Sequence, residues 1–224
     1  MRTVGEDPLW ITNGSFWTGN LDANTIAGVP KPTVLAWIED RTSDRWFRTE
    51  VMTLVTDQIT SSDPAPSVAP DVSPDWLARL QTSLDVLATV PTERVAYTQD
   101  AVKRRLHRHF GDRVDATVER WVTAHNDLHW ADLTAPDLAI LDWEGWGIAP
   151  AGYDAATLYC HSLLIPETAR QVHEQFADVL DTTDGQRSQL FAIARILDRA
   201  RHGDYKALAE RAKNHLRTLL GDQS

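Results

Sequence analysis

TAHNDLHWADLTAPDLAILDWEGW, residues 123–146, is the stretch of the sequence that says most about fold and function. It gathers many ionisable side chains in one short span, namely His125, Asp127, His129, Asp132, Asp142 and Glu144. Two short apolar runs, residues 121–124 and 138–141, accompany these side chains and are typical of buried strands. Three explanations suit such a pattern: metal binding, proton and phosphate chemistry, or caps and turns without a chemical role.

The positions of three carboxylates relative to these strands favour phosphate chemistry. If the two strands pair, Asp127 and Asp142 emerge at the same edge of the sheet, with Asp132 in the connection between them. Three converging carboxylates without a nearby Arg or Lys repel one another, and a divalent cation relieves that repulsion. Mg²⁺ prefers such oxygen ligands together with phosphate oxygens, which leaves one carboxylate to deprotonate a hydroxyl. The set therefore matches the requirements of phosphoryl transfer.

The same span resembles the catalytic core of the aminoglycoside phosphotransferase and choline kinase group of small-molecule kinases, which have a protein-kinase-like fold. That family carries the pattern H-G-D-L-H-x-x-N, then a spacer, then an apolar strand that ends in I-D-W/F-E. This chain has HNDLHWAD at residues 125–132 and DWE at residues 142–144. The GWGIAPAGYDAATL that follows resembles the family's approach to an Asp-bearing helix.

The resemblance implies a role for each matching residue and names the cofactors. Asp127 would be the catalytic base, Asp142 the principal Mg²⁺ ligand and Asp132 the second one. His125 would order the catalytic loop, and Asp154 would hold that loop from below. Asn126 stands at the family's glycine, and a small polar residue can adopt the left-handed conformation that a glycine allows. The implied cofactors are ATP and Mg²⁺, and the implied partners are a nucleotide and a small-molecule substrate.

Secondary-structure patterns place this core in a chain of two unequal parts. Residues 33–39 and 46–55 read as a β-hairpin, and a short helix is expected around residues 20–27. Helices are expected from Ser73, an N-cap before Pro74, at 98–111, and along most of the chain after Tyr153. By resemblance, the second hairpin strand would lead into a hinge for adenine at Leu54, Val55, Thr56 and Asp57.

These patterns predict an α+β fold, namely a protein-kinase-like two-lobe fold with a reduced β N-lobe and a large helical C-lobe. The N-lobe would comprise residues 1–60, with the hairpin and the hinge. A Pro-, Ser- and Asp-rich linker would span residues 61–75. The C-lobe, residues 76–224, would carry the catalytic loop and the metal site.

Composition limits the partners and the compartment. A net charge of −10 over 224 residues argues against binding to nucleic acid or an anionic membrane, although Mg²⁺ could still hold a small anionic ligand. No segment has the roughly 18 apolar residues of a membrane span, and no signal peptide is visible. Cys160 is the one cysteine and sits in an apolar helical pattern, so we expect a buried thiol and a reducing cytoplasm.

Several residues near the motif allow a substrate-binding or a structural interpretation. They are His129, Trp130, Glu144, Trp146, Tyr153 and Asp154. Rigid aromatic side chains can stack on a ring of the substrate, but they more often fill a core, which is the interpretation we favour for Trp143. Asp154 could equally be the N-cap of the helix that follows it. Acidic C-terminal helices would line the substrate site if the acceptor is cationic, as aminoglycosides are.

Three functions compete on this basis. The first is an ATP- and Mg²⁺-dependent phosphotransferase acting on a hydroxyl of an aminoglycoside-like or other small molecule. The second is a catalytically impaired pseudokinase that binds a nucleotide, ligand or partner, because Asp132 replaces the family's Asn and Lys31 is the single lysine before the hairpin. The third is a metal-dependent hydrolase whose Zn²⁺ ligands would be His125, Asp127, His129 and Asp132. The sequence leaves the acceptor and the oligomeric state open.

Overall fold

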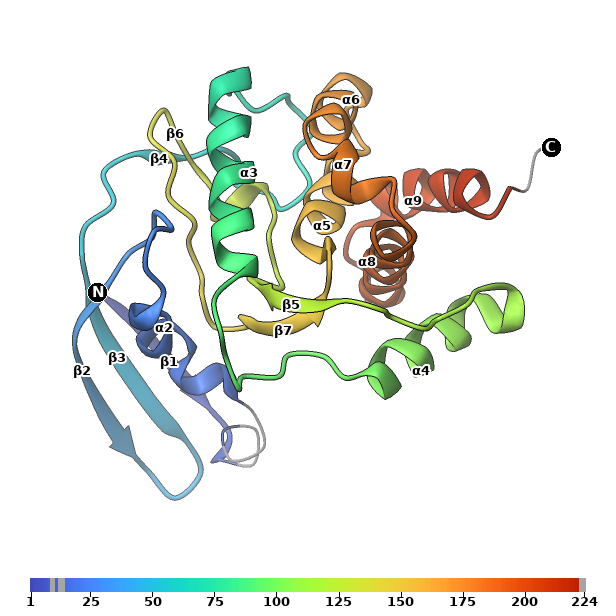
Figure 1. Ribbon diagram of the computed structural model, residues 1–224. Helices are drawn as coiled ribbons and strands as arrows, with labels where there is room; N and C mark the ends of the chain where they lie inside the picture. Colours follow the sequence, from blue (N-terminus) through green and yellow to red (C-terminus); the bar gives the residue numbers. More distant parts are fainter. Residues whose placement is uncertain (9–10, 12–14, 222–224) are drawn as a thin grey trace.

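A computed structural model describes residues 1–8, 11 and 15–221 of the chain. The N-terminal part contains an antiparallel sheet of β1 (Arg2–Glu6), β3 (Trp46–Met52) and β2 (Val34–Arg41), in that order (Figure 1). The predicted hairpin is confirmed as β2 and β3, which pair from Val34↔Met52 to Arg41↔Trp46. Strand β1 was not predicted, because RTVGE lacks the alternation of apolar and polar residues that marks a half-buried strand.

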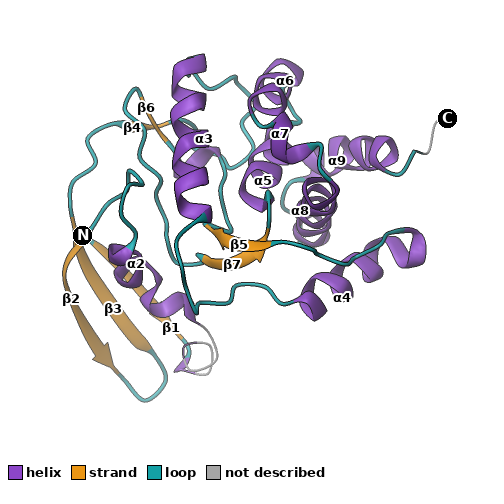
Figure 2. Cartoon of the chain, in the orientation of Figure 1, coloured by secondary structure: helices purple, strands orange, loops and turns teal. Residues whose placement is uncertain are grey.

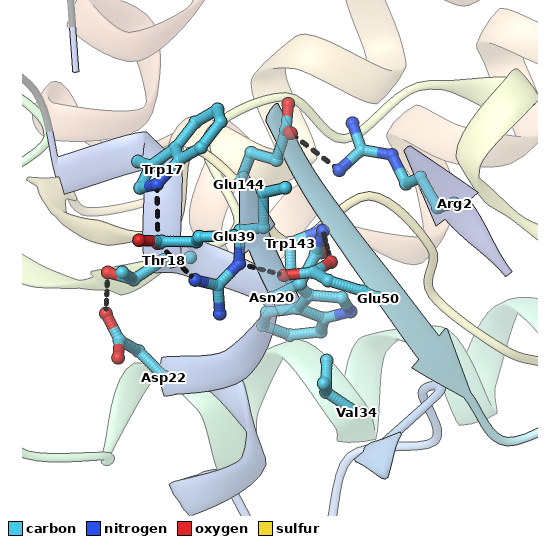
Figure 3. A network of polar contacts seen from close by, with 12 residues as sticks. Arg2, Trp17, Thr18, Asn20, Asp22, Val34, Glu39, Glu50, Trp143 and Glu144 are labelled. Atoms are coloured by element: carbon cyan, nitrogen blue, oxygen red, sulfur yellow. Dashed lines mark hydrogen bonds and ion pairs between the residues drawn. The ribbon is translucent and has the colours of Figure 1, made fainter. Parts of the chain in front are cut away.

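A short helical segment fastens this sheet to the rest of the protein. It consists of a 3₁₀ turn at Ser15–Thr18, α2 (Gly19–Asp22) and a second 3₁₀ turn at Ala23–Thr25, where one helix over residues 20–27 was expected. The side chain of Asn20 donates to Glu50 on β3 at 3.1 Å and accepts the backbone N–H of Trp143 at 2.9 Å (Figure 3). Gly19 is required here, since a Cβ would overlap the backbone of Glu144.

The segment after the sheet crosses the larger, helical part of the molecule. Strand β4 (Gln58–Ile59) pairs with β6 (Thr134–Ala135), and the Thr60 hydroxyl donates to the Trp130 carbonyl at 2.6 Å. Residues 61–73 have no regular structure, and α3 begins at Pro74, so the predicted linker includes the first helical turn. The Ser73 side chain caps α3 by accepting the Trp76 N–H at 3.2 Å, as its sequence predicts.

Helices form most of the C-terminal part (Figure 2). They are α3 (Pro74–Ala88), α4 (Gln99–Phe110), α5 (Tyr153–Ser162), α6 (Pro166–Gln175), α7 (Ala177–Leu180), α8 (Thr183–Arg201) and α9 (Lys206–Leu219), with 3₁₀ turns at Gly111–Arg113 and Trp130–Asp132. One apolar cluster joins α3 to the 128–146 region, and a second joins α4, α8 and α9. Cys160 is buried, as expected, and no described helix is long and apolar enough to cross a membrane.

One predicted strand pairing is wrong. Strand β5 (Trp121–Ala124) forms as expected, but its partner is β7 (Gly147–Pro150) rather than residues 138–141. The 138–141 segment is not a strand: the N–H groups of Ile140 and Leu141 donate to the carbonyls of Pro30 and Asp132. Its apolar residues pack into a core from a loop, and periodicity does not separate these two cases in so short a run. The two carboxylates therefore do not emerge from paired strands.

Candidate functional site

The loop that follows β5 is held in place by a buried carboxylate. The backbone N–H groups of His125 and Asn126 donate to the two oxygens of Asp154, at 2.7 and 2.8 Å. Burial raises the pKa of Asp154, although the His125 side chain and the two N–H donors act in the opposite direction. The N-cap of α5 is Gly152, which makes the N-cap interpretation of Asp154 wrong. Asp154 instead fixes the backbone directly before Asp127.

Asn126 adopts the left-handed conformation that its position in the motif predicts, with φ of 74°. Its side-chain amide donates to the carbonyls of Ala124, Gly145 and Gly147, each at 3.1 Å. An asparagine is among the residues that tolerate positive φ, and here its side chain also bonds the backbone on both sides of the site. The loop and the 145–147 segment are thereby tied together.

His125 is fully buried behind the same loop. Its Nε2 lies 2.7 Å from the carbonyl of Leu141 and therefore donates to it, and its ring packs edge-on against Trp143. Its Nδ1 is buried and makes no hydrogen bond to any described residue. These contacts hold residues 141–143 against the loop, so His125 connects the first and last parts of the motif.

Asp127 projects from this loop and pairs with an arginine of α8. Its Oδ1 accepts from the Arg195 guanidinium at 2.9 Å, and about half of its side chain is exposed. Arg195 also donates to the carbonyl of Asn126 and to the hydroxyls of Tyr97 and Tyr153. Burial is the largest single influence and raises the pKa of Asp127, but the charges of Arg195, His129 and His125, together with the Arg195 hydrogen bond, leave that pKa below its ordinary value. Asp127 is thus ionised and oriented at neutral pH.

Asp132 and Asp127 lie close enough to Asp142 for their negative charges to affect its pKa. Burial raises the pKa of Asp142, and the negative charges of Asp132 and Asp127 raise it further. The backbone of Asp142 is left-handed, with φ of 57°, which turns the chain directly after the buried 138–141 segment. Asp132 is buried, and its Oδ2 lies 2.9 Å from Nδ1 of His129.

An arginine from the N-terminal sheet also lies beside these carboxylates. Arg2 on β1 lies 2.6 Å from Glu144 (Figure 3). The same guanidinium lies 3.6 Å from Asp142. The expectation that no arginine lies near the carboxylates is therefore wrong, since both Arg2 and Arg195 are adjacent to them. Neither arginine was predicted. Arg195 could have been suspected from its place inside the apolar run FAIARIL, but Arg2 has no such signal.

The hydrolase hypothesis is not supported by this geometry. Among the residues that the structure describes, no three His, Cys, Asp or Glu side chains are placed to hold a metal ion together. His125 uses Nε2 in a bond to the backbone, and Asp127 is bonded to Arg195. The proposed H-x-D-x-H zinc site is accordingly not assembled.

The aromatic residues near the motif are core residues. Trp130, Trp143, Trp146 and Tyr153 are each at most 3% exposed, so their rings belong to the core, although Tyr153 also lines a cavity beside Asp127. Trp130 stacks on Trp76, and the indole N–H of Trp146 donates to the carbonyl of Gly19. The packing fits the structural interpretation for Trp130, Trp143 and Trp146, while a substrate contact of Tyr153 stays a prediction.

The segment 53–57, between β3 and β4, contains the residues expected to contact adenine. Leu54 is 85% exposed and Thr56 is exposed, while Val55 and Asp57 are half-buried. An apolar side chain as exposed as Leu54 is available to a ligand or partner. The adenine contacts of Leu54, Val55, Thr56 and Asp57 remain a prediction.

A cavity of about 200 Å³ opens beside Asp127. Helices α5 and α8 and the start of α9 supply most of its walls. His161 on α5 is buried in the wall, and its Nδ1 lies 2.8 Å from the carbonyl of Thr157, to which it donates. Burial lowers the pKa of His161 to about 4, with His129 and Arg195 acting in the same direction.

Acidification is expected to destabilise the fold through His161. Between pH 6.5 and pH 4 the unfolded chain binds a proton at this ring that the folded chain does not. The neutral His161 ring therefore contributes on the order of 3 kcal/mol to the free energy of unfolding above pH 6.5, and this contribution is lost as pH falls toward 4. Urea unfolding of the wild type and of His161→Gln across this range measures it as a difference. A pH-independent difference would show that His161 titrates normally.

Three solved structures share this architecture. Aminoglycoside 2′-phosphotransferase-IIIa in its GDP complex matches at a TM-score of 0.63 and 18% identity, covering 95% of this chain and 87% of that one. An aminoglycoside phosphotransferase from Streptomyces rimosus ATCC10970, with ADP and streptomycin, matches at 0.56 and 16%, covering 86% and 85%. A macrolide 2′-phosphotransferase from Brachybacterium faecium matches at 0.50 and 13%, covering 94% and 84%.

Sequence comparisons find no counterpart. No family model matches the chain, and no curated protein matches it. At identities of 13–18% the structural likeness establishes the fold and no more. The chain has the protein-kinase-like fold of aminoglycoside and macrolide phosphotransferases.

Proposed function

We propose that this protein transfers the γ-phosphoryl group of ATP to a hydroxyl of a small molecule in the cytoplasm. The observation that carries the proposal is Asp127 itself, which Arg195 orients beside a cavity, with the charges of Asp132 and Asp142 close enough to influence one another. It gains support from the fold, because solved proteins with this fold are phosphotransferases, two of them bound to GDP or ADP. Residues 1–60 and 76–224 would be the two lobes, with the hinge at Leu54–Asp57 between them.

Asp127 is the proposed base. Arg195 bonds its Oδ1, and no hydrogen bond to Oδ2 is found among the described residues. The free oxygen is available to accept the proton of an acceptor hydroxyl that enters from the adjacent cavity. The low pKa of Asp127 suits a role in orienting the hydroxyl, with the proton leaving late in the transfer.

Asp132 and Asp142 are the proposed ligands for Mg²⁺. The two carboxylates fit the ion, because they supply hard oxygen ligands, and because the charge of Asp132 adds to burial in raising the pKa of Asp142. Mg²⁺ bound there would neutralise charge on the phosphate oxygens. Two carboxylates suffice, since Mg²⁺ keeps waters and takes its remaining ligands from substrate phosphates.

Arg2 is the proposed cation for the phosphates on the sheet side. Protein kinases use a lysine of the N-terminal sheet that forms an ion pair with a glutamate. Here Arg2 on β1 forms an ion pair with Glu144 (Figure 3) and also lies beside Asp142. The pair would hold the guanidinium in position until the phosphates bind.

Removing the carboxylate of Asp142 is expected to weaken MgATP binding by about tenfold or more, because the metal then has a single protein ligand. Calorimetric titration of MgATP into the wild type and Asp142→Ala tests this expectation. Asp137→Ala is the matched control, because Asp137 is an exposed aspartate of the same stretch. Arg2→Ala should weaken binding as well. Absence of MgATP binding to the wild type would show that the proposed function is wrong.

A second candidate is a pseudokinase that binds a nucleotide without transfer. The contacts of Arg2 with Asp142 and of Arg195 with Asp127 favour it, because each neutralises a carboxylate that catalysis requires. The two candidates differ in one measurement on the wild type. MgATP binding with no phosphoryl transfer to any of a set of hydroxyl compounds would favour the pseudokinase.

A further inference from the structure

We propose that the acceptor is a small hydroxy compound carrying a carboxylate or phosphate group, and that Arg199 binds this anionic group. The inference rests on the proposed function and adds the class of substrate to it. It follows from the charges, hydrogen bonds and volume of the cavity beside Asp127. A cationic acceptor, which acidic C-terminal helices would have favoured, does not suit these walls.

The charges of the cavity walls are the first argument. Two guanidinium groups, those of Arg195 and Arg199 on α8, line the cavity. Asp127 supplies the sole carboxylate among the lining residues that the structure describes, and Arg195 already bonds it. His161 is neutral at pH 7, because burial lowers its pKa to about 4. An acceptor with several ammonium groups would find only Asp127 in this lining to pair with, already bonded to Arg195, so most of its charges would be desolvated without a partner.

Of the two arginines, Arg199 is the one whose present ion-pair partner a bound anion can replace. Its Nε lies 2.9 Å from Asp204, and the side chains of this pair are 62% and 49% exposed. Such an exposed pair stabilises a protein by about 0–1 kcal/mol, so a bound anion can replace it. Arg195 differs, because it donates to Asp127, the Asn126 carbonyl and two tyrosine hydroxyls. Arg195 therefore orients the base, and Arg199 is left for the ligand.

His161 and Tyr205 also line the cavity, with the Tyr205 ring next to Arg199, and they indicate a polar, compact ligand. Because Nδ1 of His161 donates to the Thr157 carbonyl, Nε2 carries a lone pair and has no partner among the described hydrogen bonds. It can accept a bond from a ligand hydroxyl. Tyr205 has φ of 53°, a conformation that is rare for aromatic residues, and its ring meets His161 edge-on. Backbone strain of this kind is often retained at binding sites.

The size of the cavity is the last argument. A volume of about 200 Å³ is below the roughly 300–1,000 Å³ of pockets that bury drug-sized ligands. An acceptor of a few carbons fits, whereas a multi-ring aminoglycoside would extend beyond it. Size and charge together favour a small hydroxy acid or hydroxyalkyl phosphate.

Four three-carbon probes of matched size test the proposal without nucleotide: D-glycerate, glycerol 3-phosphate, glycerol and 3-amino-1,2-propanediol. Their affinities for the full chain can be measured by ligand-observed NMR titration. We expect at least one of the two anions to bind about tenfold more tightly than glycerol, and the amine to bind most weakly. The better of the two anions distinguishes a carboxylate from a phosphate.

Charge reversal at Arg199 locates the site. Arg199→Glu should remove the preference for anions, whereas Arg201→Glu should leave it unchanged. Arg201 is the matched control because it lies on the same helix with 61% of its side chain exposed and outside the cavity. The proposal is wrong if neither anion binds, if glycerol or the amine binds as tightly, or if Arg199→Glu keeps the preference. All of these outcomes are measured as binding without nucleotide. They therefore test the proposed acceptor separately from the proposed phosphoryl transfer.

Discussion

Replacing Asp127 with asparagine is expected to lower the rate of phosphoryl transfer by about 10²–10⁴-fold, the usual contribution of a general base. The asparagine keeps the size of the side chain and can still accept from Arg195, so loop and cavity should persist. Nucleotide binding should also persist, because Asp142 and Asp132 are the proposed metal ligands. Single-turnover kinetics with ATP and a confirmed acceptor, together with MgATP calorimetry, measure both quantities.

The control for this prediction is Asp137→Asn, which changes an exposed aspartate of the same stretch. It should keep both turnover and binding. The acidic side of the pH profile offers a second check, since the charge of Arg195 keeps the pKa of Asp127 below its ordinary value. Activity should therefore be insensitive to protonation of Asp127 near neutral pH. Unchanged turnover in Asp127→Asn would remove Asp127 from the mechanism.

Local signals were sufficient for much of the fold. Ser73 caps α3 and Thr98 caps α4 through their own side chains, and Gly111 ends α4 with φ of 63°. Such signals act within a few residues, so the sequence displays them directly. Strand β1 and the 138–141 segment were mispredicted because their structure depends on distant partners, namely β3 for the former and Pro30 for the latter.

The candidate site shows the same contrast between features that depend on neighbours in sequence and features that depend on distant residues. The motif spacing predicted which carboxylates would be near one another, since residues 125–132 and 142–144 are close in sequence. It did not predict the arginines, because Arg195 lies 68 residues after Asp127 and Arg2 is at the opposite end of the chain. Both arginines change the electrostatics of the site: Arg195 is one of the groups that lower the pKa of Asp127, and Arg2 places a cation beside Asp142. Contacts over such distances are fixed by packing rather than by local pattern.

Replacing Asp154 with alanine is expected to reduce the free energy of unfolding by about 2–6 kcal/mol and to abolish phosphoryl transfer. Two backbone N–H groups, those of His125 and Asn126, would lose their acceptor inside the protein, and each unsatisfied donor costs about 1–3 kcal/mol. The loop that carries Asp127 would then lose its fixed geometry. Urea unfolding measures the first effect, and transfer kinetics under conditions where the variant is folded measure the second.

Asp184→Ala is the matched control, because the structure repeats the same arrangement away from the site. The two oxygens of Asp184 accept the backbone N–H groups of Glu119 and Arg120, at 3.1 and 2.8 Å. Asp184 is similarly buried, so both variants should lose stability by comparable amounts. Only Asp154→Ala should lose transfer out of proportion to its folded fraction. Equal losses of activity in the two variants would mean that Asp154 supports the fold and has no specific role in positioning Asp127.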